Sequence, residues 1–173
     1  MPNSHGQQVI AIEEHYYDAD VVKHFEGASA HVGDLIRDRL EDVNSIRLKD
    51  MDATGIDIQV LSHGAPATQR MEAALAIEVA RGANDRLAEI VKSHPDRFAG
   101  FAVLPTADPI AAADELARAV NELGFKGAMI HGLANGKFLD DPQFWPIFER
   151  AQELDVPIYL HPAIPHQDVI DIY

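Results

Sequence analysis

Apolar and polar residues follow two different periods along this chain. Short runs rich in Val, Ile and Leu predict strands at residues 8–15, 56–63, 98–105, 125–132 and 156–163. Between them, apolar residues recur at helical spacing and predict helices at residues 45–55, 71–97, 106–124 and 140–155. The stretch 16–44 is polar, and we expect it to be irregular. The pattern therefore predicts strands that alternate with helices.

Capping residues mark where several of these helices begin and end. Asp108 and Asp141 each precede a proline, a combination that is typical of a helix N-terminus. Gly55 ends the helix predicted at residues 45–55, and Gly124 ends the helix that begins after Asp108. A glycine commonly closes a helix at such positions. These signals place helix boundaries independently of the apolar spacing.

Strands that alternate with helices need right-handed crossovers and therefore form a parallel sheet. Two architectures fit this order, an open doubly wound sheet and a (β/α) barrel. Neither a GxGxxG motif after the first strand nor a GxxxxGK[ST] motif occurs, which argues against the nucleotide-binding sheets. The length of 173 residues suggests a single domain, residues 1–173. Polar residues at the predicted strand ends favour the barrel.

Composition excludes several classes of function. Fourteen basic and 28 acidic residues give a net charge of -14, which argues against nucleic acid and anionic membranes as partners. The absence of cysteine excludes disulfides, thiolate metal sites and cysteine nucleophiles. The polar start MPNSHGQQ does not resemble a signal peptide, and no apolar run could span a bilayer. We therefore expect a cytoplasmic protein.

Histidines gather at the ends of the predicted strands. Of nine histidines, four close a strand: His15, His63, His131 and His161. In a parallel barrel these strand ends open onto one face, where active sites are built. Because side chains alternate along a strand, Glu13 and His15 point to one side and Glu14 to the other. One carboxylate and two imidazoles suit Zn, Mn or Fe(II), so Glu13, His15 and His161 are candidate metal ligands.

The chain resembles the aminocarboxymuconate-semialdehyde decarboxylase branch of the amidohydrolase superfamily, which includes γ-resorcylate decarboxylase. The resemblance rests on the order of the stretches AIEEH, RLKDMDATGIDIQVLS, ANDRLAEIVKSHPDRFAGFAVLP, LGFKGAMIHG and DDPQFWPIFERAQELDVPIYLHP. It implies the α/β class and a distorted (β/α)8 TIM barrel with one divalent metal, Mn or Zn. The family's Glu-x-His motif falls on Glu13 and His15, and its fifth-strand histidine falls on His161.

Two further groups of the family lie on later strands. They are a histidine after strand five and an aspartate at strand eight, which completes the metal site and is the usual candidate for proton transfer. The sequence ends at Tyr173. We therefore expect an N-terminal portion that supplies about the first five strands and leaves two strand edges to be paired. Where His131 precedes Gly132, many of these decarboxylases carry Asn.

The resemblance implies a metal-dependent, non-oxidative decarboxylase (a carboxy-lyase) that acts on a small aromatic or unsaturated carboxylic acid. The metal would hold the substrate's carboxylate and an adjacent hydroxyl. His161, His63 and His131 are the candidate catalytic residues, the last two through hydrogen bonds to the substrate. Edge-to-edge pairing of chains would make the protein a homo-oligomer.

Two other functions stay open. A hydrolase of a lactone, ester or amide would use the same ligands to activate water. The binuclear hydrolases of the superfamily usually carry His-x-His and a carboxylated lysine, whereas this chain has Glu13 and no lysine on the fifth strand. That difference favours a mononuclear site and the decarboxylase. A structural or regulatory half-barrel without metal is the third possibility.

Overall fold

The structure is a computed structural model that describes residues 6–27 and 32–162. Within these residues, five parallel strands follow one another along the chain: β1 (Ile10–Tyr16), β2 (Ile58–His63), β3 (Phe98–Gly100), β4 (Ala128–His131) and β5 (Ile158–His161). The helices between them are α3 (Ser45–Thr54), α4 (Ala73–Ser93), α5 (Pro109–Asn121) and α6 (Trp145–Glu153), the last preceded by the 3-10 turn η2 (Pro142–Phe144).

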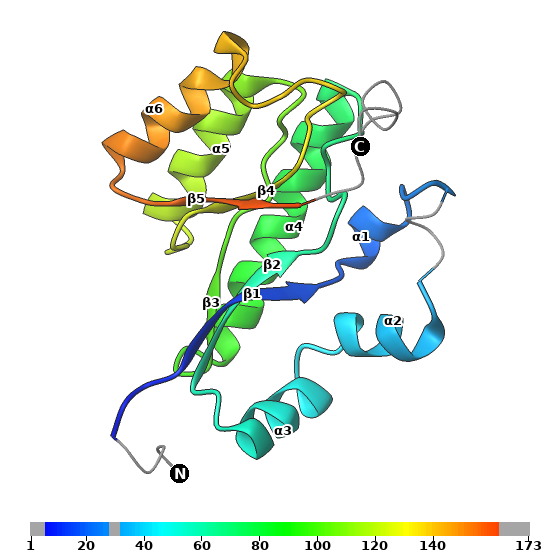
Figure 1. The fold of residues 1–173 in the computed structure, drawn as a ribbon, viewed down its shortest axis with the longest axis vertical. Coiled ribbons are helices and arrows are strands. Elements are labelled where there is room, and N and C mark those ends of the chain that lie inside the picture. Colours follow the sequence, from blue (N-terminus) through cyan, green and yellow to red (C-terminus); the bar gives the residue numbers. More distant parts are fainter. Residues whose placement is uncertain (1–5, 28–31, 163–173) are drawn as a thin grey trace.

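The strands lie in chain order, as in a (β/α)8 barrel. β1, β2 and β3 form one hydrogen-bonded sheet and β4 and β5 another, and a parallel bridge between Ala102 and Ala128 joins the two. In Figure 1, α5 and α6 lie side by side next to β4 and β5, and α4 follows the strands behind β2. The expected TIM-barrel type is confirmed, with this chain supplying consecutive strands of the wall.

Side-chain caps explain several helix boundaries. The Asp108 carboxylate accepts hydrogen bonds from the backbone N–H groups of Ile110 and Ala111, and Asp141 accepts one from Gln143. Gly55 adopts a φ of 74° as the C-cap of α3, a conformation that glycine adopts without strain. The capping signals in the sequence were therefore correct at these positions.

The expectation of an irregular stretch at 16–44 was wrong. It contains α1 (Ala19–Val22), whose first N–H groups bond to the Asp18 carboxylate, and α2 (Asp34–Glu41). Neither helix has a long apolar repeat, because α1 has four residues and α2 has eight. Strand β3 is also shorter than predicted, since regular pairing ends at Gly100 and only the bridge at Ala102 continues it.

Two apolar layers cover the two faces of the strands. The larger core lies between the strands and the outer helices, and its fully buried members include Leu61, Leu87, Leu116, Ile130 and Ile147. On the inner face, Val60, Phe101 and Met129 form a smaller cluster against Tyr159. At the start of β4, a Cβ on residue 127 would lie 2.3 Å from the Pro157 carbonyl oxygen, so Gly127 permits this close approach to β5.

A buried amide joins α4 to the layer of strands. Asn84 accepts a hydrogen bond from the Val103 backbone N–H and donates to the Val103 carbonyl, each at 2.9 Å. It also donates to the Glu115 carboxylate at 2.7 Å, and Glu115 is paired with Arg118. The chain after β3 has left regular pairing here, and Asn84 supplies its backbone with the partners that a neighbouring strand would otherwise provide.

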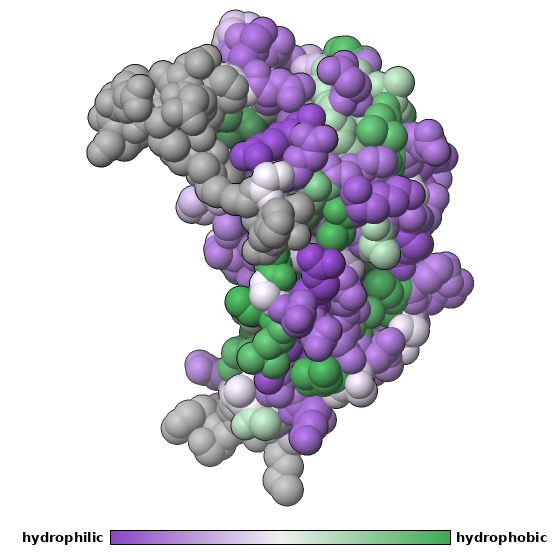
Figure 2. All heavy atoms as spheres, turned by 90° about the vertical axis from the view of Figure 1, so that its right-hand side faces the viewer, coloured by the Kyte–Doolittle hydropathy of each residue, from purple (hydrophilic) through white to green (hydrophobic). Residues whose placement is uncertain are grey.

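On the side of the molecule that carries α1 and α2, apolar surface is exposed at several places between polar side chains (Figure 2). The exposed large apolar residues of β1, α2 and α3 are Ile10, Ile12, Leu35, Ile36 and Ile46. No helix among the described residues combines the length and the apolar character that crossing a membrane requires.

Candidate metal centre

The carboxyl ends of β1 and β5 bring three donor groups together. Glu13 and His15 lie on β1, and His161 is the last residue of β5. The pairing of β1 with β2 shifts register between Ala11 and Glu14, so the irregularity falls on the segment that carries the donors. Glu13 and His15 both reach His161, whereas Glu14 faces the opposite side, as the two-residue period of a strand predicts.

The spacing of the donor atoms fits one metal ion. The two Nε2 atoms of His15 and His161 lie 3.2 Å apart, and Glu13 Oε1 lies 3.3 Å from His161 Nε2. Ligand atoms at the usual 2.0–2.1 Å from a tetrahedral ion are separated by about 3.3 Å. The ligand atoms of the three residues all lie within 4.8 Å of one another. A divalent ion can therefore bind to them without a large rearrangement.

The second nitrogen of each imidazole has a hydrogen-bond partner, and for His161 this partner fixes the tautomer. His161 Nδ1 lies 2.5 Å from the Pro162 carbonyl oxygen, which only accepts hydrogen bonds, so this nitrogen carries the proton. The lone pair of the neutral ring is then on Nε2, facing His15. His15 Nδ1 lies 3.1 Å from Ser62 Oγ. Histidines that bind metals usually donate their other ring N–H in this way, so both rings are oriented as ligands.

Electrostatics favour the metal-binding forms of two of the donors, the carboxylate of Glu13 and the neutral imidazole of His15. The Tyr159 hydroxyl donates to Glu13 Oε2 and lowers the pKa of Glu13, while the pKa of Tyr159 is raised. Burial, followed by the nearby His161, lowers the pKa of His15. Metal ligands must be deprotonated, so these shifts favour cation binding at neutral pH.

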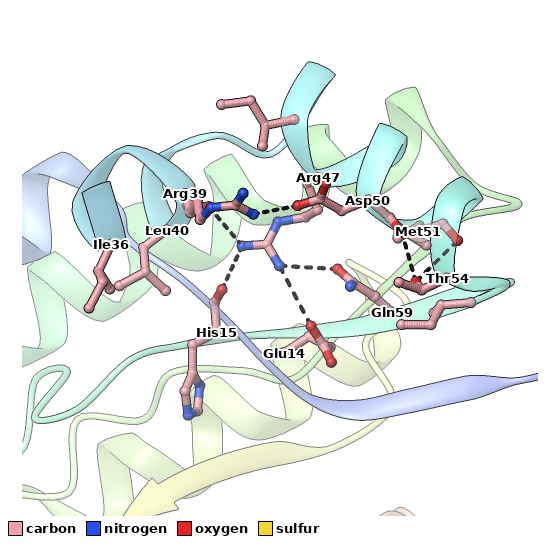
Figure 3. A pocket seen from close by; sticks show the side chains of 12 residues that line it. Glu14, His15, Ile36, Arg39, Leu40, Arg47, Asp50, Met51, Thr54 and Gln59 are labelled. Carbon is pink, nitrogen blue, oxygen red and sulfur yellow. Dashed lines mark hydrogen bonds and ion pairs between the residues drawn. The ribbon is translucent and has the colours of Figure 1, made fainter. Parts of the chain in front are cut away.

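Behind β1, a buried guanidinium supports the donor segment. Arg47 of α3 donates to the His15 carbonyl at 2.6 Å and to Gln59 Oε1 at 3.0 Å, and its Nη1 lies 4.0 Å from the Glu14 carboxylate (Figure 3). Burial raises the pKa of Glu14. These groups line a cavity of about 480 Å³ between β1 and the helices α2 and α3. Arg47 thus connects the backbone of a candidate ligand to a helix.

His131, at the end of β4, lies beside the three donors. Its ring centroid is 5.0 Å from that of His161 and 5.6 Å from that of His15. The ring is buried, and burial lowers the pKa of His131 to about 4. Its Nε2 lies 2.8 Å from the His63 carbonyl oxygen, and its Nδ1 has no hydrogen-bond partner among the described residues.

His63 is not part of this group of side chains. Its Nδ1–H donates to the Gly64 carbonyl at 2.8 Å, and its Nε2 accepts from the Asp18 backbone N–H at 3.1 Å. The ring stacks on Tyr17 and meets Phe25 edge-on, and burial lowers the pKa of His63 to about 4. Both nitrogens are thus bonded to backbone, and the ring connects the end of β2 to the start of α1.

Three residues of the site were missed in the sequence. Tyr159 precedes His161 by two positions on β5, so strand periodicity alone places both side chains on the inner face. Ser62 lies on β2 next to His63, and the pairing of His15 with Ser62 became visible only with the strand register. Arg47 could not be found from spacing, because its role depends on where α3 lies relative to β1.

Comparisons with known proteins give the family. The family model described as amidohydrolase matches residues 21–172. The chain belongs to this amidohydrolase family. Among relatives, the γ-resorcylate decarboxylase of Rhizobium sp. is 43% identical over 169 residues, which are 92% of this chain and 51% of the relative. The resemblance to the decarboxylase branch is therefore confirmed.

Solved amidohydrolases agree in fold and carry a metal. A dihydroxybenzoic acid decarboxylase from Polaromonas sp. with bound manganese and the inhibitor 2-nitroresorcinol has a TM-score of 0.86 at 42% identity, over 96% of this chain and 53% of that one. A 5-carboxyvanillate decarboxylase from Novosphingobium aromaticivorans, also with manganese, has a TM-score of 0.93 at 32% identity, over 99% and 55%. The neighbours are manganese-containing decarboxylases, and the expected divalent metal is consistent with the donor set of this chain. The chain spans about half the length of the curated relatives it matches.

Proposed function

We propose that this amidohydrolase chain provides the metal-binding half of a manganese-dependent decarboxylase that acts on hydroxylated aromatic carboxylic acids. The observation that carries the proposal is the preformed donor set of Glu13, His15 and His161, with donor atoms 3.2 and 3.3 Å apart. The similarity to decarboxylases of dihydroxybenzoate and 5-carboxyvanillate supports the reaction and the substrate class.

Each residue would have a defined task. A divalent metal, when bound, supplies Lewis acidity toward a substrate carboxylate and an adjacent oxygen. Glu13, His15 and His161 would hold the ion, and their second partners Tyr159, Ser62 and the Pro162 carbonyl would keep them oriented. His131 faces the same region with an unused acceptor and would contact the substrate, whereas the bonds of His63 to backbone suit a supporting role.

Metal binding is the first test. Isothermal titration of the chain with MnCl2, and separately with ZnCl2, is expected to give one site per chain. His161→Ala should weaken binding on the order of 100-fold, because it removes a direct ligand of a site with few protein donors. His94→Ala is the matched control, since His94 caps the far end of α4. Equal metal affinity in the two variants would disprove the assigned site.

The reaction is tested separately. The manganese-loaded chain, alone and joined to the second half of the Rhizobium γ-resorcylate decarboxylase, is incubated with a panel of hydroxybenzoates, and CO2 release is measured. We expect release from 2,6-dihydroxybenzoate by at least the joined form, and its loss in His15→Ala. A metal-loaded protein that releases no CO2 from the panel but cleaves lactones or esters would reject the decarboxylase in favour of the hydrolase.

A further inference from the structure

Hydrogen bonds hold both the backbone and the buried ring of His131 in place. The Gln69 side chain accepts from the His131 backbone N–H at 2.5 Å and donates to the His131 carbonyl at 2.9 Å. The ring Nε2 lies 2.8 Å from the His63 carbonyl oxygen. Gln69 and His131 are both 3% exposed. The direction of the ring is therefore fixed by neighbours that belong to other strands and loops.

This arrangement also fixes which nitrogen carries the proton. A carbonyl oxygen only accepts hydrogen bonds, so the proton of the neutral His131 ring is on Nε2. Nδ1 then presents a lone pair, and it has no partner among the described residues. A buried acceptor without a donor is unfavourable, and native proteins rarely retain one without a function. The site thus contains a hydrogen-bond acceptor with a fixed direction, to which no described residue donates.

The acceptor lies next to the candidate metal ligands but is not one of them. The His131 ring centroid is 5.0 Å from that of His161. The group of ligand atoms within 4.8 Å of one another consists of Glu13, His15 and His161. A molecule bound to the metal through its carboxylate would therefore bring its neighbouring substituents toward His131. Because the His131 acceptor is a neutral nitrogen, it favours a substituent that donates a proton, such as an un-ionised hydroxyl.

We propose that His131 determines substrate specificity by accepting, at Nδ1, a hydrogen bond from an un-ionised ring hydroxyl adjacent to the carboxylate. The proposal rests on the proposed function, since it needs an aromatic carboxylate at the metal centre. It names a chemical difference that the site can detect. A hydroxyl at this position is accepted, whereas a methoxy group, which has no proton to donate, leaves the acceptor unpaired.

The test compares two ligands in which a methyl group replaces this proton. The manganese-loaded chain is titrated calorimetrically with 2,6-dihydroxybenzoate and with 2-hydroxy-6-methoxybenzoate. We expect the first to bind about tenfold more tightly, the value of one hydrogen bond in a buried site. Equal affinities for the two acids would overturn the proposal.

Two variants separate recognition from support. His131→Asn retains an acceptor near the position of Nδ1 but cannot reach the His63 carbonyl, whereas His131→Gln retains a donor near Nε2 and lacks the Nδ1 acceptor. We expect the tenfold preference to remain in Asn and to disappear in Gln, with manganese affinity within about threefold of wild type in both. If His131 only supports the fold, the order is reversed: the preference for 2,6-dihydroxybenzoate is close to wild type in His131→Gln and reduced in His131→Asn. That result would overturn the proposal.

The outcomes also distinguish this proposal from the proposed function. If His131→Gln keeps the full preference for 2,6-dihydroxybenzoate, His131 does not recognise the hydroxyl, although carboxylate binding at the metal stands. If neither acid binds the manganese-loaded wild-type chain, the proposed function fails and this inference fails with it. Circular dichroism of the two variants confirms that each is folded before the affinities are compared.

Discussion

Arg47 gives the most direct test of how the structure holds its candidate metal ligands. Its side chain is 9% exposed and donates to the carbonyl groups of His15 and Asp42 and to Gln59. We predict that Arg47→Met lowers both the free energy of unfolding and the affinity for Mn²⁺. Methionine keeps most of the apolar stem and removes the charge with all of its hydrogen bonds.

The magnitude follows from the contacts that are lost. Each hydrogen bond from a charged donor contributes about 1.5–3 kcal/mol, but the freed carbonyl groups regain water from the adjoining cavity. Attraction to Glu14 at 4.0 Å is about 4 kcal/mol at an effective dielectric of 20, most of it offset by desolvation. A net loss of about 3 kcal/mol in the free energy of unfolding is expected. Loosening the backbone of His15 should weaken Mn²⁺ binding about tenfold, as for other outer partners of ligands.

Urea unfolding and calorimetric Mn²⁺ titration measure the two effects. Arg39→Met is the matched control, because the same substitution in the same cavity removes only an exposed ion pair with Asp50. It should cost less than about 1 kcal/mol and leave Mn²⁺ affinity unchanged. If Arg47→Met costs no more than Arg39→Met, the guanidinium does not support β1 and the reasoning is wrong.

Three further predictions concern other buried or charged groups. Asn84→Leu should lower the free energy of unfolding by about 3 kcal/mol in urea, because the Val103 backbone loses both partners; an unchanged midpoint would contradict this. His63 has a folded-state pKa of about 4, below its ordinary value, so the unfolded chain binds the proton first as pH falls. Stability should therefore drop between about pH 6.5 and 4, with His63 contributing about 2 kcal/mol at pH 5 and His131, whose pKa is also about 4, a similar amount. His63→Gln should therefore remove about half of this dependence of the urea midpoint on pH. Glu13→Gln should weaken Mn²⁺ binding on the order of 100-fold and lower the pKa of Tyr159 in an ultraviolet titration; an unshifted tyrosine would show that the Glu13–Tyr159 hydrogen bond does not form.

The sequence predicted those parts of the fold that depend on local physics. Strand periodicity put Glu13 and His15 on the face opposite Glu14. Aspartate–proline pairs located the start of α5 and the start of the 3-10 turn η2 that precedes α6. Helix α2 was missed because it is only eight residues long and has three apolar residues, too few to establish a helical period. The end of regular pairing at Gly100 was also missed, since the pairing length depends on the neighbouring strands.

The site shows the same division. The candidate metal ligands could be proposed from the sequence because carboxylate and imidazole groups at strand ends have a restricted chemistry. His63 and His131 look alike in the sequence, because each is a histidine that closes a predicted strand. Their surroundings differ, since His63 bonds to backbone at both nitrogens, whereas Nδ1 of His131 has no donor within residues 6–27 and 32–162. Only tertiary contacts distinguish two histidines in such equivalent positions.

The loop that follows β2 is hydrogen-bonded both to the chain after β3 and to the end of β4. Thr68 donates to the Leu104 carbonyl at 2.9 Å, and the adjacent Gln69 bonds to both backbone groups of His131 at the end of β4. The hydrogen bonds of this one loop therefore fix the position of these two segments relative to each other along the barrel axis. Inserting or deleting a single residue in this loop would shift His131 relative to β5. The length of the loop is therefore constrained by the position that His131 must keep.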